Sequence, residues 1–415
     1  MRRLLAGVVK IGAGVAAGQL IVILVSPVLS RLFDPSEFGI YAIIVSVSAM
    51  LMVILSGRLD LAVATSANNR QAREAAMLGA CYLTAGATAI AIVFLVIAVG
   101  SATGLVDTLA VEYFFIPVVV VFAGLFELSS AYLVRRGRYG QAAWRSLILN
   151  GSLAGSQVGL GAFSFPAGLT VGYLLSRVIG TVYSARVGGL SLARDVRGLR
   201  QTGLGVVVKR TAHFPLVVAP SSLLNTLGTQ APILLFGLLL GPAAAGLFGF
   251  AQRILSAPAA LLGQSLAQVY TAETAFSLRN MQGNSRSLFL KTSLLLLIAG
   301  ATVGLAVYFL SPLAFEPVFG DAWVEAGLIA QALSLGVGAQ LIVVPLSQTM
   351  IVHGHHRAQF YWDASRFIVV VVVILGAFAA GADASGMAWA FSISSFAAYA
   401  ALWCLCFRAV SLSGG

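Results

Sequence analysis

Long apolar runs separated by short polar connections dominate the pattern of hydrophobic and polar positions in this 415-residue chain. A helix needs about 20 apolar residues to cross the hydrocarbon core of a bilayer. Twelve runs meet this requirement, so the pattern predicts an all-α integral membrane protein with twelve transmembrane helices. The predicted spans are 8–32, 38–57, 76–98, 113–134, 146–164, 167–187, 215–240, 243–269, 289–311, 326–350, 367–381 and 386–407.

A short segment recurs half a chain later and divides the twelve spans into two sets of six. Pro35 and Gly39 stand four residues apart in the first copy, and Pro242 and Gly246 keep that spacing in the second. Because six is even, both sets enter the membrane from the same side, which makes the repeats parallel. We expect an N-terminal lobe over 1–200 and a C-terminal lobe over 201–415. Such a duplication is the usual build of a secondary transporter.

The first copy of the repeat also carries a helix-start signal. Asp34 can cap the following helix, Pro35 suits its first position, and Glu37 can reach back to the cap amide. A catalytic role in a lipid-dependent glycosyltransferase is the alternative for these paired acids. The cap spacing explains them without that chemistry.

Composition excludes a sizeable soluble domain. The chain is 59% hydrophobic and 9% charged, with a mean hydropathy of +0.95, whereas soluble domains carry about 25% charged residues. Its three cysteines, Cys81, Cys404 and Cys406, lie in apolar runs and indicate small apolar fillers, not a disulfide framework.

The net charge of +11 would suggest nucleic acid in a soluble protein. Here the N-terminus and every second connection hold all the basic residues except Arg31, Arg177 and Arg253. Short connections rich in Lys and Arg stay in the cytoplasm. We therefore expect a multi-pass protein with both termini cytoplasmic and no nucleic-acid partner. The short outer connections argue against a polymerase or a ligase, which need a sizeable external loop.

Charged residues inside or at the ends of spans are the candidate site. Charge at a helix centre costs about 2.5–3.5 kcal/mol, so such residues normally face a wet interior. A cationic cavity for an anionic head group is one interpretation, because the planar guanidinium donates two bonds to phosphate. The alternatives are internal pairing, for example of Glu127 with Arg177, and snorkelling of Arg31. The candidates are Arg31, Arg58, Arg177 and Arg253, with Glu127 and Asp60 in support.

Uncharged polar side chains add to the second half of the chain. They would either hydrogen-bond between helices or meet sugar hydroxyls in a cavity. The sequence holds no phosphate-binding loop, nucleophile elbow or metalloprotease motif, so we expect no cofactor, no metal and no enzyme. An ion gradient (H⁺ or Na⁺) or the substrate gradient would then drive transport. The uncharged candidates are Asn225, Gln230, Gln252, Gln264, Gln268, Gln340 and Gln348.

Glycine pairs at four-residue spacing predict close approach of neighbouring helices. Three such pairs lie in predicted spans: Gly14/Gly18, Gly151/Gly155 and Gly300/Gly304.

Several segments together resemble one family. They include Arg31-Leu-Phe-Asp-Pro-Ser-Glu-Phe-Gly39, Arg58-Leu-Asp-Leu-Ala-Val-Ala, Phe214-Pro-Leu-Val-Val-Ala-Pro, Gly246-Leu-Phe-Gly-Phe-Ala-Gln-Arg253 and Phe319-Gly-Asp-Ala-Trp323. In this order and spacing they resemble polysaccharide flippases of the Wzx type (O-antigen flippases), in the superfamily of multidrug, oligosaccharidyl-lipid and polysaccharide exporters.

The resemblance implies a fold and a function as expectations. Two six-helix lobes would form a V with a central cavity, and Arg31, Arg58 and Arg253 fall on recurring arginines of the family. Alternating access would carry an undecaprenyl-diphosphate-linked oligosaccharide across the bacterial inner membrane, for lipopolysaccharide or exopolysaccharide synthesis. We expect a monomer in contact with membrane lipid, a polymerase and glycosyltransferases. The alternatives are a multidrug or organic-cation antiporter of the same superfamily and, from another class, a polysaccharide polymerase or ligase.

Overall fold

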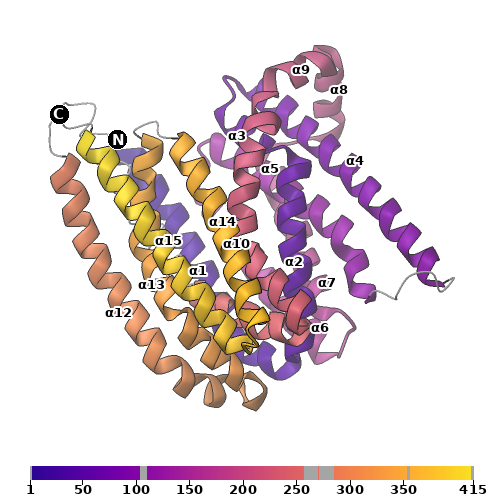
Figure 1. Cartoon of the computed structure of the whole chain (residues 1–415). Helices are drawn as coiled ribbons and strands as arrows, with labels where there is room; N and C mark the ends of the chain where they lie inside the picture. The colour runs from indigo at the N-terminus through magenta and orange to yellow at the C-terminus, as the bar shows by residue number, and fades with distance from the viewer. Residues whose placement is uncertain (1, 103–109, 257–269, 271–284, 353–355, 413–415) are drawn as a thin grey trace. The chain divides into compact units, whose positions relative to one another are not determined.

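Helices make up the regular structure of the described residues, which are 2–102, 110–256, 270, 285–352 and 356–412 of a computed structural model (Figure 1). In the first half they are α1 Arg2–Leu32, α2 Pro35–Ser56, α3 Leu59–Thr65, α4 Asn69–Ala102, η1 Val111–Phe115, α5 Ile116–Arg135, α6 Tyr139–Ala162, α7 Gly168–Gly188, α8 Leu192–Thr202 and α9 Leu204–Thr211. In the second half they are η2 Phe214–Val218, α10 Ala219–Leu240, a helix over 242–256, α12 Ser285–Phe319, η3 Asp321–Trp323, α13 Val324–Val352, α14 His356–Ala379 and α15 Ala384–Leu412.

Nine helices of the described chain are long and apolar enough to cross a membrane, and each coincides with a predicted span. The chain is therefore a multi-pass membrane protein. Three further predicted spans stay predictions. Two of them, 146–164 and 167–187, correspond to α6 and α7, which are long but more polar helices. The third, 243–269, is described only as far as residue 256.

By their contacts the residues form two compact units. One contains Met1–Val25 with Ile40–Gln230, and the other contains Ser26–Gly39 with Ala231–Gly415. In the first unit α7 packs against both α5 and α6, and α4 packs against α5 and the short helix α3. Helices α8 and α9 lie against the N-terminal part of α4 (Figure 1). The lobe boundary at 200/201 remains a prediction.

In the second unit α13 packs between α12 and α15, and α14 packs along α15 (Figure 1). Small residues permit the approach of α12 to α13, because a methyl group at Gly300 would lie 2.7 Å from the carbonyl oxygen of Gly338. Gly304 likewise faces Ser334 on α13. The predicted close packing at Gly300/Gly304 is confirmed.

The other two glycine pairs give opposite results. A methyl group at Gly14 would lie 2.6 Å from the Cα atom of Ala143, and one at Gly18 would lie 2.5 Å from Nδ2 of Asn150, so this pair is confirmed. At Gly151 and Gly155, no atom of the described chain lies within 4 Å of an added methyl group. The predicted close packing is therefore not found at this pair among the residues that the structure describes.

The repeat found in the sequence is the place where two helix starts cross in the second unit. A methyl group at Gly39 would lie only 1.7 Å from the carbonyl oxygen of Pro242, and one at Gly246 would lie 1.7 Å from the carbonyl oxygen of Pro35. The proline of each copy thus contacts the glycine of the other copy. Only glycine permits this separation of the two backbones.

Aromatic side chains pack the end of α1 and the start of α2 against residues of the second half of the chain. The indole N–H of Trp323 donates to the carbonyl oxygen of Ser30 at 2.9 Å. The Trp323 ring is fully buried, with centroids 5.1 Å from that of Phe38 and 4.2 Å from that of Phe250. One tryptophan therefore joins the end of α1, the start of α2 and the helix over 242–256.

The predicted capping box at the start of α2 is confirmed. The backbone N–H of Glu37 donates to Oδ1 of Asp34 at 2.8 Å, and the backbone N–H of Asp34 donates to Oε2 of Glu37 at 3.0 Å. Both carboxylates thus satisfy amides that the helix leaves free. They stabilise the turn that brings Gly39 to its crossing point.

We predict that Gly39→Ala and Gly246→Ala each lower the free energy of unfolding by about 1–3 kcal/mol, because overpacking forces the two backbones apart. Thermal and denaturant unfolding of the protein in detergent measures this. Gly151→Ala is the matched control, since it meets open space inside a helix and should stabilise it by up to about 1 kcal/mol. Equal stability of Gly39→Ala and this control would contradict the crossing.

Candidate functional site

A tight turn after α2 positions the first candidate arginine. Gly57 and Arg58 both adopt φ of 54°, in the left-handed region, and the short helix α3 begins at the next residue. A left-handed conformation is uncommon for a residue other than glycine, and such residues concentrate at functional sites. The sequence places Arg58 at the end of a span, but it gives no indication of this turn or of α3.

Three of the predicted site residues line one cavity in the first unit. Arg58, Asp60 and Glu127 belong to a cavity of about 280 Å³, which is also lined by Met52, Val53, Ser56, Gly124 and Leu128. Nη2 of Arg58 lies 3.4 Å from Oδ2 of Asp60, with the two side chains 27% and 19% exposed. This pair is accessible from the cavity, so a ligand there can compete for the guanidinium.

Two further arginines of the same unit contact aromatic rings of α5 and α7. The guanidinium carbon of Arg177 lies 4.7 Å from the ring centroid of Tyr173 and 5.2 Å from that of Phe126. The guanidinium carbon of Arg145 lies 5.1 Å from the same Phe126 ring. The negative face of an aromatic ring stabilises a cation without neutralising its charge. Both guanidinium groups therefore keep their full charge.

Glu127 joins these cations to the cavity by longer-range electrostatics. It is adjacent in sequence to Phe126, its side chain is exposed, and its charge attracts both Arg145 and Arg177. Within the described chain, Glu127 and Arg177 make no ion pair, so the predicted alternative of direct pairing is wrong. The reason is that the Arg177 guanidinium packs on the rings of Phe126 and Tyr173 instead.

Three of these guanidinium groups have a buried donor that the described part of the protein leaves unsatisfied. The Nε–H groups of Arg58, Arg145 and Arg177 are buried and donate to no partner among the residues that the structure describes. Buried donors normally find a partner in protein, water or a bound ion. Arg58, Asp60 and Glu127 line the cavity, while Arg145 and Arg177 lie on the neighbouring Phe126 ring. Taken together, these five residues, which we call the cationic cluster, hold three guanidinium groups and two carboxylates.

The remaining predicted site residues are distributed over both units. Arg31 is exposed at the end of α1, in the second unit, and Arg253 and Gln252 lie half-buried on the helix over 242–256 of that unit. In the first unit Asn225 is exposed on α10. Gln230 accepts a hydrogen bond from the Ser46 hydroxyl at 3.0 Å, as expected for a contact between helices.

Some predictions fall outside the described residues. These are the glutamines Gln264 and Gln268.

Arg145 is the cluster residue that the sequence does not single out. The prediction places it in a basic connection before a span that starts at 146, but α6 begins at Tyr139, so Arg145 lies inside the helix. The signal in the sequence that could have identified Arg145 is an arginine followed directly by an apolar run. The aromatic partners Phe126 and Tyr173 are not distinguishable from ordinary apolar residues of a span.

One protein family and one curated relative are similar to this chain in sequence. Residues 28–328 match the profile of a family described as polysaccharide biosynthesis protein. A curated relative is the teichuronic acid biosynthesis protein TuaB of Bacillus subtilis (strain 168), 24% identical over 177 residues, which are 42% of this chain. The match covers 36% of the relative's own length.

Solved structures of low sequence identity share the fold. The lipid II flippase MurJ in an inward closed conformation has a TM-score of 0.68 at 12% identity and covers 98% of this chain and 90% of its own. An inward-facing multidrug resistance MATE family transporter of the MOP superfamily has a TM-score of 0.66 at 14% identity, covering 95% of both chains. At this identity the likeness shows a common fold.

A double-mutant cycle tests the cation–ring contact on which the cluster depends. Phe126→Leu and Arg177→Met, made singly and together, should show a coupling free energy of about 0.5–2 kcal/mol, because either change removes the same interaction. Unfolding in detergent with denaturant measures the four stabilities. Strict additivity of the two single changes would contradict the contact.

Proposed function

Because the chain belongs to the polysaccharide biosynthesis protein family, we propose that it is a flippase for an undecaprenyl-diphosphate-linked oligosaccharide, the repeat unit of a bacterial polysaccharide. Its multi-pass helices and its fold, shared with a lipid II flippase and a MATE transporter, support a transporter of the MOP superfamily. A lipid-linked unit of a lipopolysaccharide or exopolysaccharide is the cargo that fits this combination.

The cationic cluster of the first unit is the observation that carries the choice of cargo. Arg58 opens onto a cavity of about 280 Å³, and Arg145 and Arg177 add two charges held on aromatic rings. A diphosphate is a dianion or trianion with oxygen acceptors arranged for bidentate guanidinium bonds. The excess of arginine over carboxylate therefore favours a diphosphate headgroup.

We propose that transport occurs by alternating access, through rocking of two six-helix lobes. Arg58 and Arg253 would engage the diphosphate, with Arg177, Arg31, Glu127 and Asp60 in support, and the uncharged side chains of Asn225, Gln230 and Gln252 would meet the sugars. A gradient of H⁺ or Na⁺, or the substrate gradient itself, would drive the cycle without a cofactor. The protein acts as a transporter and performs no covalent chemistry.

The proposal includes a location and partners. Basic connections on one side of the predicted spans support cytoplasmic termini, in a protein of the bacterial inner membrane. A monomer would receive its cargo from glycosyltransferases and deliver it to a polymerase. Membrane lipid surrounds it, and nucleic acid is not a partner.

An organic-cation antiporter is the second candidate, and the likeness to a multidrug resistance transporter favours it. A cation would prefer a surplus of carboxylates, and the lining of the cavity itself holds Asp60 and Glu127 against Arg58. The wider cationic cluster, with Arg145 and Arg177 on the Phe126 ring, holds the opposite surplus and favours an anion. A polysaccharide polymerase or ligase is less compatible, since the fold is shared with a flippase and a transporter.

We predict that Arg58→Gln and Arg253→Ala each slow transport about tenfold or more, because each removes a charge-assisted hydrogen bond to the diphosphate. Flipping of a fluorescent undecaprenyl-diphosphate-linked sugar in reconstituted vesicles measures this. Arg186→Gln, at an exposed position near the end of α7, is the matched control and should transport normally. Transport by Arg58→Gln and Arg253→Ala at the control rate would remove these residues from the mechanism.

Ligand-induced stabilisation separates the flippase from the cation antiporter. Farnesyl diphosphate should raise the Tm of the detergent-solubilised protein, whereas tetraphenylphosphonium should leave it unchanged, because the cluster attracts anions. Arg58→Gln should reduce the shift produced by the diphosphate. Stabilisation by the cation alone would favour the antiporter instead.

A further inference from the structure

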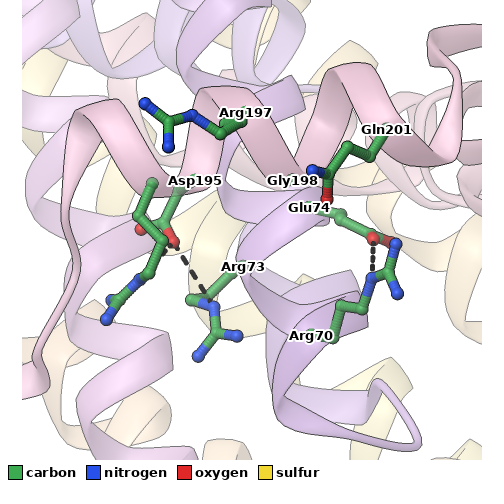
Figure 2. A pocket seen from close by; sticks show the side chains of 8 residues that line it. Arg70, Arg73, Glu74, Asp195, Arg197, Gly198 and Gln201 are labelled. Carbon is green, nitrogen blue, oxygen red and sulfur yellow. Dashed lines mark hydrogen bonds and ion pairs between the residues drawn. The ribbon is translucent and has the colours of Figure 1, made fainter.

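A second basic pocket lies apart from the cluster around Phe126, where the start of α4 meets α8 (Figure 2). Its volume is about 290 Å³. The lining consists of Arg70, Arg73, Glu74, Arg194, Asp195, Arg197, Gly198 and Gln201. Four guanidinium groups thus surround two carboxylates, and the pocket has an excess of positive charge.

The two carboxylates hold the pocket together. The Glu74 side chain is 3% exposed and accepts hydrogen bonds from Arg70 at 3.0 Å and from Arg210 at 2.7 Å. The Asp195 side chain is 5% exposed and lies 3.3 Å from Nε of Arg73 and 3.4 Å from Nε of Arg194. Each carboxylate pairs with two arginines, so the two carboxylates together do not neutralise all the arginines around the pocket.

Arg197 takes no part in this pairing. It is exposed, lines the pocket, and makes no ion pair or side-chain hydrogen bond with the residues that the structure describes. In Figure 2 its guanidinium stands apart from the Asp195 and Glu74 carboxylates, whereas dashed lines join Arg73 to Asp195 and Arg70 to Glu74. It offers an anion donors that no carboxylate already occupies.

An apolar pocket continues from the basic one. Arg73 and Asp195 line both, and the second pocket, of about 180 Å³, is otherwise almost entirely apolar. Its other lining residues are Ala76, Met77, Ala80, Leu125, Leu128, Ser129, Thr181, Ala185 and Leu190. A charged pocket and an apolar pocket therefore lie side by side on either side of Arg73 and Asp195.

The order of these residues along α4 indicates which of the two pockets lies deeper along the span. Arg70 and Arg73 lie in the first turns of a candidate membrane span that runs Asn69–Ser101, and Met77 and Ala80 lie one to two turns further along it. At about 1.5 Å per residue, the apolar pocket lies up to about 10 Å deeper than Arg73. The basic pocket lies at the end of the span and the apolar pocket lies deeper. This order matches one bilayer leaflet, in which charged headgroups lie above hydrocarbon chains.

We propose that these joined pockets bind a lipid with a phosphate headgroup, the phosphate between Arg73, Arg194 and Arg197 and the first part of the hydrocarbon chain against Met77, Ala80 and Ala185. An anionic phospholipid and a polyprenyl phosphate share this chemistry. The basic connections predict that this end of α4 faces the cytoplasm, so the lipid would belong to the inner leaflet. The site does not depend on the transported cargo, and a binding measurement tests it whether or not the protein is a flippase.

Binding of fluorescent phosphatidylglycerol to the full-length protein in detergent micelles tests the proposal. Arg197→Gln should weaken binding about fivefold, because one arginine near an anionic headgroup contributes about 1 kcal/mol. Arg200→Gln, an exposed arginine on the same helix outside the pocket lining, should leave affinity unchanged. Equal affinity of these two variants would overturn the assignment of the phosphate.

Two further ligands and one more variant test the hydrocarbon part. Phosphatidylcholine and glycerol phosphate should bind weakly, the first for lack of net charge and the second for lack of a chain. Ala80→Phe, which fills the apolar pocket, should weaken phosphatidylglycerol binding while the Tm stays near that of the parent protein. Glycerol phosphate binding as tightly as the lipid, or no effect of Ala80→Phe, would overturn the lipid site.

Competition with a polyprenyl phosphate identifies the source of the lipid. Tighter binding of polyprenyl phosphate than of phosphatidylglycerol supports a site for a carrier lipid. The reverse order supports a site for bulk membrane phospholipid. Failure of both lipids to bind would contradict the proposal.

Discussion

The backbone contact between two helix starts is the constraint on which the second unit depends. Lipid tails are as apolar as leucine, so helices in a membrane associate through close packing rather than through hydrophobic burial. Gly39 and Gly246 bring each helix within reach of the proline carbonyl of the other, and no side chain fits between them. Trp323 then fixes the hairpin through its hydrogen bond to the carbonyl oxygen of Ser30. A duplicated Pro-x-x-x-Gly segment thus serves as the contact between the two copies.

The sequence predicts those features that depend on local pattern or on the repeat. Apolar runs locate the helices, and the Asp34–Glu37 spacing predicts a capping box that the structure contains. The turn at Arg58 and helix α3 were not predictable in this way, because a left-handed residue other than glycine depends on its surroundings. Arg145 was missed for a similar reason. Its role follows from the ring of Phe126 on another helix, which no spacing along the chain reveals.

Aromatic rings take the place of carboxylates at the cationic cluster of the first unit. An ion pair between Arg177 and Glu127 would neutralise the charge, whereas the rings of Phe126 and Tyr173 stabilise the guanidinium and leave it positive. In the pocket between α4 and α8, carboxylates stabilise the arginines instead, and buried Glu74 and Asp195 each pair with two of them. Counted over each whole set of residues, both arrangements hold more guanidinium groups than carboxylates, one among the helices of a unit and one at the end of a span.

The central claim is that the cavity beside Arg58 receives a diphosphate headgroup, and photocrosslinking tests it most directly. A polyprenyl diphosphate with a photoreactive group next to the phosphates would be bound to the reconstituted protein, irradiated, and mapped by mass spectrometry. We predict crosslinks on the segments that line this cavity, residues 52–60 and 124–128, and their loss in Arg58→Gln. Crosslinks confined to other segments, with these two unlabelled, would contradict the account.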